Sequence, residues 1–110
     1  MVIGITEVKP KNSKNILNPA EFNLEWTNEY NMFYTNIDNN IGRGLILYVD
    51  KSVHAEEVKL ESTFQENIFV KIKTNKQEQI LIGLVYRSPS DTTIENNRDL
   101  CNLVTEALNI

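Results

Sequence analysis

Short apolar runs and polar turns alternate along most of this chain, which is the pattern of a protein rich in β-strands. Two runs are apolar almost throughout, and they predict strands that are covered on both faces. Other runs alternate or are rich in β-branched and aromatic residues, which also favours strands. The predicted strands span residues 2–8, 30–36, 44–50, 55–61, 67–74 and 79–87, of which 2–8 and 44–50 are the apolar ones.

The turns between these runs refine the prediction. Polar residues 75–78 separate the runs 67–74 and 79–87, which indicates a hairpin. Gly83 lies inside the second run and predicts a bulge or a close approach of the backbone. Residues 55–61 alternate only weakly, so we expect an edge strand there. The long polar segment 9–28 contains apolar side chains, and we expect it to pack against the domain, with a short turn near Pro19.

A helix is predicted at the end of the chain. Thr92 and Glu95 have the spacing of a capping box. Apolar residues then recur on one helical face, at Leu100, Leu103, Val104, Ala107 and Leu108. The fold class is therefore α/β in the broad, α+β sense, with about six mostly antiparallel strands and a C-terminal helix. One helix does not cover such a sheet, so we expect residues 1–110 to be a partial domain, truncated at both ends.

Composition narrows the possible functions. The chain has 110 residues and a net charge of −4, which suits one domain and excludes a strong nonspecific grip on nucleic acid or anionic membranes. No apolar run approaches the roughly 18 residues of a membrane helix, so we expect no membrane partner. The single cysteine, Cys101, and single histidine, His54, exclude a Cys/His zinc site and a disulfide framework. An intracellular, reducing compartment is expected.

Four features are candidates for chemistry, each with an ordinary structural explanation beside it. Glu7 ends the first strand, where an acid either marks a simple strand end or holds a metal ion. Tyr86 and Arg87 end the last strand, where both could contact a phosphate. The structural alternative is that the Tyr86 ring covers the core and that Arg87 is an ordinary surface arginine before a turn. The glycine-flanked Arg43 indicates a turn into a strand rather than a phosphate loop, because no helix follows it. Three lysines after Glu7 predict a solvated loop or a nucleic-acid contact: Lys9, Lys11 and Lys14.

Several stretches, in this order, resemble a known superfamily. They are Ile5-Thr6-Glu7, then GRGLILYV (42–49), ENIFVKI (66–72), ILIGLVYRSPS (80–90) and NNRDLCNLVTEAL (96–108). Together they are similar to the endonuclease/exonuclease/phosphatase, or DNase I-like, superfamily, and most of all to the endonuclease domain of non-LTR retrotransposons. The resemblance covers nearly the whole chain.

The resemblance implies a fold and a reaction. The fold is a four-layer α/β sandwich, of which this chain would hold the N-terminal half. The reaction is Mg²⁺-dependent hydrolysis of a phosphoester, with Glu7 as the metal ligand and Tyr86 and Arg87 as the catalytic phosphate contacts. In the full-length parent the partners would be DNA and the missing C-terminal half. Such a nuclease meets chromosomal DNA in the nucleus, yet no basic localisation run is present.

The chain departs from the family pattern in ways that bear on catalysis. The asparagine-ending first strand and the later GDFN-like and SDH-like motifs are missing, and His54 does not replace the catalytic histidine. We therefore expect a fragment that is inactive alone, since the general base is absent. Two alternatives stay open: a non-catalytic binding or accessory module that uses the same half-sandwich, including a pseudogene remnant, and an unrelated α+β domain. The last alternative predicts that Glu7 and Tyr86 lie far apart.

Overall fold

The computed structural model of the protein describes residues 2–9, 17–22, 29–39, 41–62, 64–74, 78–87 and 93–109. Within these ranges the chain forms six strands, one α-helix and one short 3-10 helix. In chain order they are β1 (Val2–Thr6), η1 (Pro19–Phe22), β2 (Tyr30–Thr35), β3 (Leu45–Asp50), β4 (His54–Val58), β5 (Asn67–Lys73), β6 (Gln79–Val85) and α1 (Ile94–Leu108). The expected strand-rich organisation with a C-terminal helix is thus confirmed.

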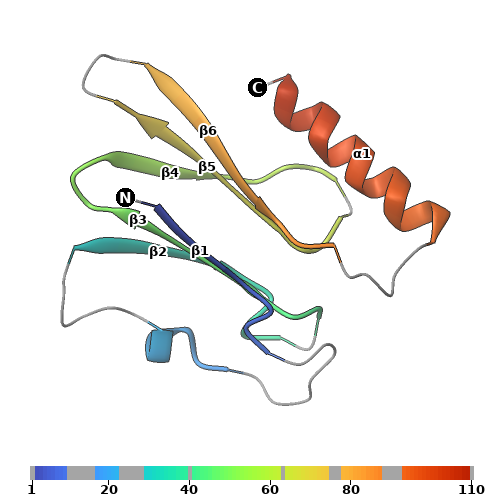
Figure 1. Cartoon of the computed structure of the whole chain (residues 1–110), viewed down its shortest axis with the longest axis horizontal. Coiled ribbons are helices and arrows are strands. Elements are labelled where there is room, and N and C mark those ends of the chain that lie inside the picture. Colours follow the sequence, from blue (N-terminus) through green and yellow to red (C-terminus); the bar gives the residue numbers. More distant parts are fainter. Residues whose placement is uncertain are drawn as a thin grey trace.

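The strands form two sheets of three, with the orders β1-β3-β2 and β4-β5-β6. Every strand pair in the described residues is antiparallel, including the hairpin that β5 and β6 were expected to form. The sheets lie face to face, and the chain passes from one to the other between β3 and β4 (Figure 1). The expectation that a single helix leaves such a sheet poorly covered is therefore wrong, because each sheet covers the inner face of the other.

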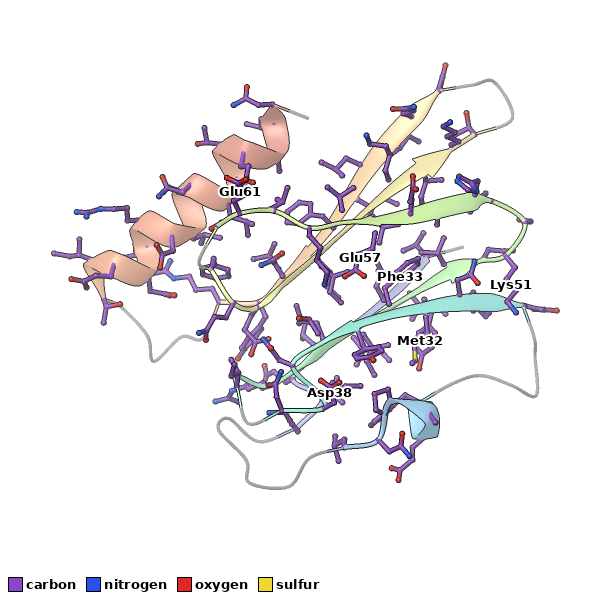
Figure 2. All side chains as sticks on the ribbon, turned by 180° about the vertical axis from the view of Figure 1, so that it is seen from behind. Met32, Phe33, Asp38, Lys51, Glu57 and Glu61 are labelled. Atoms are coloured by element: carbon purple, nitrogen blue, oxygen red, sulfur yellow. The ribbon has the colours of Figure 1, made fainter. Side chains whose placement is uncertain are left out.

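The core between the sheets follows from the two-residue period of the central strands. Alternate residues of β3 and β5 point inward and are almost completely buried: Leu45, Leu47, Val49, Ile68, Val70 and Ile72. Phe33 of β2 packs against this core, whereas the next residue back, Met32, packs on the outer side of its sheet. Figure 2 shows these two side chains pointing to opposite faces. The nearly continuous apolar run of β3 is explained by burial on both of its faces.

Helical segments also pack on the outer face of each sheet, η1 on the first sheet and α1 on the second (Figure 1). On the first sheet, Ile46 and Tyr48 of β3 pack beneath Phe22 of η1, and the Tyr48 hydroxyl donates a hydrogen bond to the Phe22 carbonyl. On the second sheet, Leu103 of α1 packs against Phe69 and its neighbours. The expectation that the long loop packs down is confirmed for residues 17–22.

Strand β1 differs from its sequence-based prediction. Val2 and Ile5 remain 39% and 41% exposed, although the run predicted a strand covered on both faces. The reason is position, because β1 lies at the edge of its sheet and pairs only with β3. Strand β4 is also an edge strand, as its weak alternation predicted.

Gly83 allows a close contact within the second sheet. It lies opposite Phe69 in the regular ladder of β5 and β6, and a Cβ at this position would overlap the Phe69 ring. The expected close approach is confirmed, and the partner is an aromatic ring rather than a bulged backbone.

Helix α1 begins one residue later than its sequence predicts. Its N-cap is Thr93, whose hydroxyl accepts a hydrogen bond from the Asn96 backbone N–H at 3.2 Å. The predicted capping box between Thr92 and Glu95 is therefore wrong, and Thr92 itself lies outside the described residues. Two adjacent threonines offer the same hydroxyl, so the local sequence does not select between them. No helix in the ranges given above is long and apolar enough to cross a membrane.

Candidate functional site

Four residues that flank strand ends meet at one end of the sandwich. Glu7 follows β1, Arg43 precedes β3, Glu66 precedes β5 and Tyr86 follows β6. Antiparallel pairing explains each half of this set, because the end of β1 lies beside the start of β3, and the end of β6 beside the start of β5. We call these four residues the Arg43 cluster.

Glu7 leaves its strand with an unusual backbone. Its φ is +54°, in the left-handed region that costs a residue with a side chain about 1–3 kcal/mol. The Glu7 carboxylate accepts a hydrogen bond from the Arg43 guanidinium, with Oε2 and Nη1 3.0 Å apart, and its side chain is 47% exposed. The backbone turn therefore points an accessible carboxylate toward the facing strand starts.

The loop that carries Arg43 is fixed by its glycines and by Lys9. Gly42 and Gly44 have φ values of +57° and +83°, as the predicted turn into a strand requires. Lys9 Nζ donates to the carbonyls of Ile41 and Gly42 at 3.2 and 2.9 Å, and its backbone N–H donates to the Arg43 carbonyl at 2.8 Å. The backbone beside the guanidinium is thus held in place.

Lys9 does not have the solvated position that its sequence predicts. It is only 5% exposed, because its ammonium group satisfies carbonyls of the neighbouring loop instead of facing solvent or a nucleic acid. The other two lysines of that sequence cluster, Lys11 and Lys14, lie outside the described residues.

Glu66 joins the two sheets. Its Oε1 accepts the backbone N–H of Arg43 at 2.5 Å, and its own carbonyl accepts the Tyr86 N–H at 3.1 Å. Its second carboxylate oxygen is buried and has no hydrogen-bond partner among the described residues, and the same holds for the Nε of Arg43. Buried polar atoms without partners are uncommon in folded proteins and often mark a functional position. A nearby second bond, from Asn36 Nδ2 to the Gln65 carbonyl at 3.0 Å, ties the sheets at the same end.

Tyr86 brings the cluster together. Its ring is partly buried against the core between the sheets, and the Arg43 guanidinium lies 6.0 Å from the ring centre. The same guanidinium is paired with the Glu7 carboxylate, so Arg43 contacts both Glu7 and the Tyr86 ring. Glu7 and Tyr86 therefore adjoin the same guanidinium, which is not what the alternative of an unrelated domain predicts for this pair.

No protein-family model, curated protein or solved structure matches this chain. The side chains of the Arg43 cluster themselves indicate which ligands it suits. A guanidinium, a phenol and two carboxylates suit an anion together with a hard cation.

The cluster contains two carboxylates, the type of side chain that binds Mg²⁺ in proteins. Mg²⁺ is commonly held by one or two carboxylates and keeps several waters. Glu7 is accessible, and Glu66 offers an oxygen that has no partner. Within the described residues no group of three or more His, Cys, Asp or Glu side chains could hold a metal. Any cation here would thus be held by few protein ligands.

Arg87 and His54 lie apart from these contacts. Arg87 follows Tyr86 and is exposed, and it forms no hydrogen bond or ion pair with another described residue. Its role as a catalytic phosphate contact stays a prediction. His54 begins β4, just after the far end of β3, so it lies at the opposite end of the sandwich from Glu7.

Sequence reasoning identified Glu7 and Tyr86 but missed the roles of Arg43 and Glu66. Arg43 was interpreted only as part of a turn, and Glu66 only as the start of a strand motif. Available signals were the two flanking glycines of Arg43 and the position of Glu66 directly before an alternating strand. Neither signal reveals that the two residues face each other.

The Tyr86 hydroxyl makes the stability of the fold vary with pH in the alkaline range. Burial raises its pKa most, the Glu7 carboxylate raises the pKa further, and the positive charge of Arg43 lowers it. The net pKa is above the ordinary tyrosine value, so the folded state favours the neutral phenol. Burial also raises the pKa of Tyr48. The stability that these two neutral phenols give the folded state is fully present below the ordinary tyrosine pKa. It is lost as the pH rises through their raised pKa values in the folded protein.

We therefore expect the urea midpoint to fall as the pH rises through the tyrosine range, and to fall less in Tyr86→Phe. Urea unfolding at a series of alkaline pH values, with tyrosinate absorbance followed in parallel, measures this. An identical alkaline decline in Tyr86→Phe and the unaltered protein contradicts the assignment to Tyr86.

Proposed function

We propose that this chain is part of a Mg²⁺-dependent phosphodiesterase of the DNase I-like superfamily, and that its parent is a retrotransposon-type DNA endonuclease. The observation that carries the proposal is that the Arg43 guanidinium contacts both the Glu7 carboxylate and the Tyr86 ring, which brings Glu7 and Tyr86 to one place. The family resemblance gives these two residues to the metal and the phosphate, and they come from different sheets. Two sheets packed face to face, with helical segments outside, also agree with the layers that the resemblance implies.

Each residue of the Arg43 cluster has a role in this proposal. Glu7 and Glu66 would hold Mg²⁺, which when bound stabilises negative charge on the scissile phosphate and the leaving oxygen. The Tyr86 hydroxyl, which keeps its proton at neutral pH like any tyrosine, would donate a hydrogen bond to a phosphate oxygen. The partner would be DNA.

We do not expect this chain alone to cleave a phosphodiester. A general base must lie within hydrogen-bond reach of the proton that it removes, directly or through one water. His54 is at the other end of the sandwich. We expect this chain to bind the cation and a phosphate.

A Mg²⁺ titration of the full chain, followed in amide ¹H–¹⁵N spectra, tests the cation site. Resonances near Glu7, Arg43 and Tyr86 are expected to shift with one saturating curve. Glu7→Gln should abolish these shifts, since it removes a charged ligand and keeps the shape of the side chain. The matched control is Glu21→Gln, which changes an exposed acid on η1 and should leave the shifts intact.

Two results would contradict the proposal. One is a set of Mg²⁺-induced shifts that Glu7→Gln leaves unchanged, and the other is shifts spread over the acidic surface without saturation. Either result would favour a non-catalytic binding or accessory module on the same scaffold. The observation in favour of that alternative is the small number of potential metal ligands in the described part of the chain.

A further inference from the structure

Arg43 has a fixed backbone and an accessible guanidinium, and a ligand could replace Glu7 as the partner of that guanidinium. Its backbone is fixed on one side by Lys9 and on the other by Glu66. Its guanidinium is held by fewer bonds than its backbone. Among the described residues Glu7 is its only hydrogen-bond acceptor, and its Nε has no partner there. The side chain is 32% exposed, so solvent and small anions reach it.

We propose that Arg43 is a phosphate-binding residue that Glu7 holds until a divalent cation takes over the Glu7 carboxylate. This inference rests on the proposed function, because it needs a cation at Glu7. A cation there neutralises the charge that holds Arg43 and repels the guanidinium. The planar fork of the guanidinium then matches two oxygens of a phosphate.

The surroundings of Arg43 keep the released side chain at the site. Because the loop backbone is bonded to Lys9 and Glu66, only the side chain moves when the ion pair opens. The partly buried Tyr86 ring lies 6.0 Å from the guanidinium and supports it by a cation–π contact. The same guanidinium is 3.0 Å from Glu7, where the cation would be, so Tyr86 and the cation site both adjoin Arg43. Arg43 and Tyr86 would thus contact one phosphate from two sides.

This arrangement makes cation and phosphate binding cooperative. Without the cation, a phosphate must compete with Glu7 for Arg43 and also meets the charge of two carboxylates. With the cation bound, both obstacles are removed. By linkage, a phosphate must then raise the affinity for the cation by the same factor.

The test uses dimethyl phosphate as a phosphodiester probe, titrated into the full chain with and without saturating Mg²⁺ and followed by NMR. In the unaltered protein, Mg²⁺ is expected to strengthen binding of the probe and to shift the Arg43 guanidinium resonances. Arg43→Gln should weaken probe binding roughly tenfold to a hundredfold in Mg²⁺, the worth of a charge-assisted hydrogen bond. Arg43→Lys keeps the charge but loses the fork, so it should recover only part of the affinity.

Arg98→Gln on the exposed side of α1 is the matched control, and it should bind the probe like the unaltered protein. Thermal unfolding of each variant shows that it is folded. If Mg²⁺ binds at Glu7 and Arg43→Gln still binds the probe normally, this inference is overturned while the proposed function stands. If Mg²⁺ does not bind at Glu7 at all, both are overturned.

Discussion

Replacing Leu103 with alanine is expected to lower the free energy of unfolding by about 2–5 kcal/mol. Leu103 has no exposed surface, and it is the residue of α1 that is fully enclosed by Phe64 and Phe69. Removing its branched side chain forfeits the transfer energy of the lost carbons and leaves a cavity over the second sheet. Urea unfolding followed by circular dichroism measures the change.

The matched control lies on the same helix. Leu108 is 80% exposed, so Leu108→Ala should change the free energy of unfolding by no more than about 0.5 kcal/mol. Polar anchors of α1 remain in both variants, because the Glu106 carboxylate accepts the N–H groups of Glu61 and Ser62. Equal destabilisation by the two substitutions would show that burial of Leu103 is not what holds α1.

Gly42→Ala is expected to destabilise the protein by about 2–4 kcal/mol and to disorganise the Arg43 cluster. The backbone at Gly42 has a φ of +57°, which strains any residue with a Cβ. The new Cβ would also overlap the Glu66 carboxylate. Glu66 must then move, and it loses its bond to the Arg43 N–H. Thermal unfolding measures the stability, and the Arg43 amide resonance reports the lost bond.

Gly4→Ala is the control for this substitution. Gly4 lies in extended backbone on β1, and a Cβ there would approach Leu84 Cδ1 at 3.1 Å, which a flexible side chain can relieve. We expect a small effect on stability and an unchanged Arg43 amide resonance. A cluster that survives Gly42→Ala unchanged would mean that Glu66 is not needed to position Arg43.

The strands could be predicted from the sequence because the period of their side chains is a local property. All six predicted runs contain a strand, with ends that differ by a few residues. How the strands divide between two sheets depends on contacts between distant residues, such as those of the core that β3 and β5 share. That information is not in the pattern, so the sequence led to one poorly covered sheet and to a buried β1.

The same limit applies to the Arg43 cluster. Glu7 and Tyr86 stood out because each ends an apolar strand. Lys9 was misplaced because a lysine beside prolines and asparagines is usually solvated, and its carbonyl partners lie more than thirty residues away. Charges whose partners come from another sheet acquire their roles only when the sheets are assembled.

The division of the chain between its two sheets has a consequence for the order of folding. The sheet β4-β5-β6 is a meander of neighbouring strands, whereas β1 reaches β3 only after the long segment between them has closed. Local pairings form before distant ones, because loop closure costs entropy before its contacts are gained. The Tyr86 side of the cluster therefore belongs to the fast part of the chain and Glu7 to the slow part. We therefore expect Glu7 and Tyr86 to come together only when β1, the last strand to pair, has docked on β3.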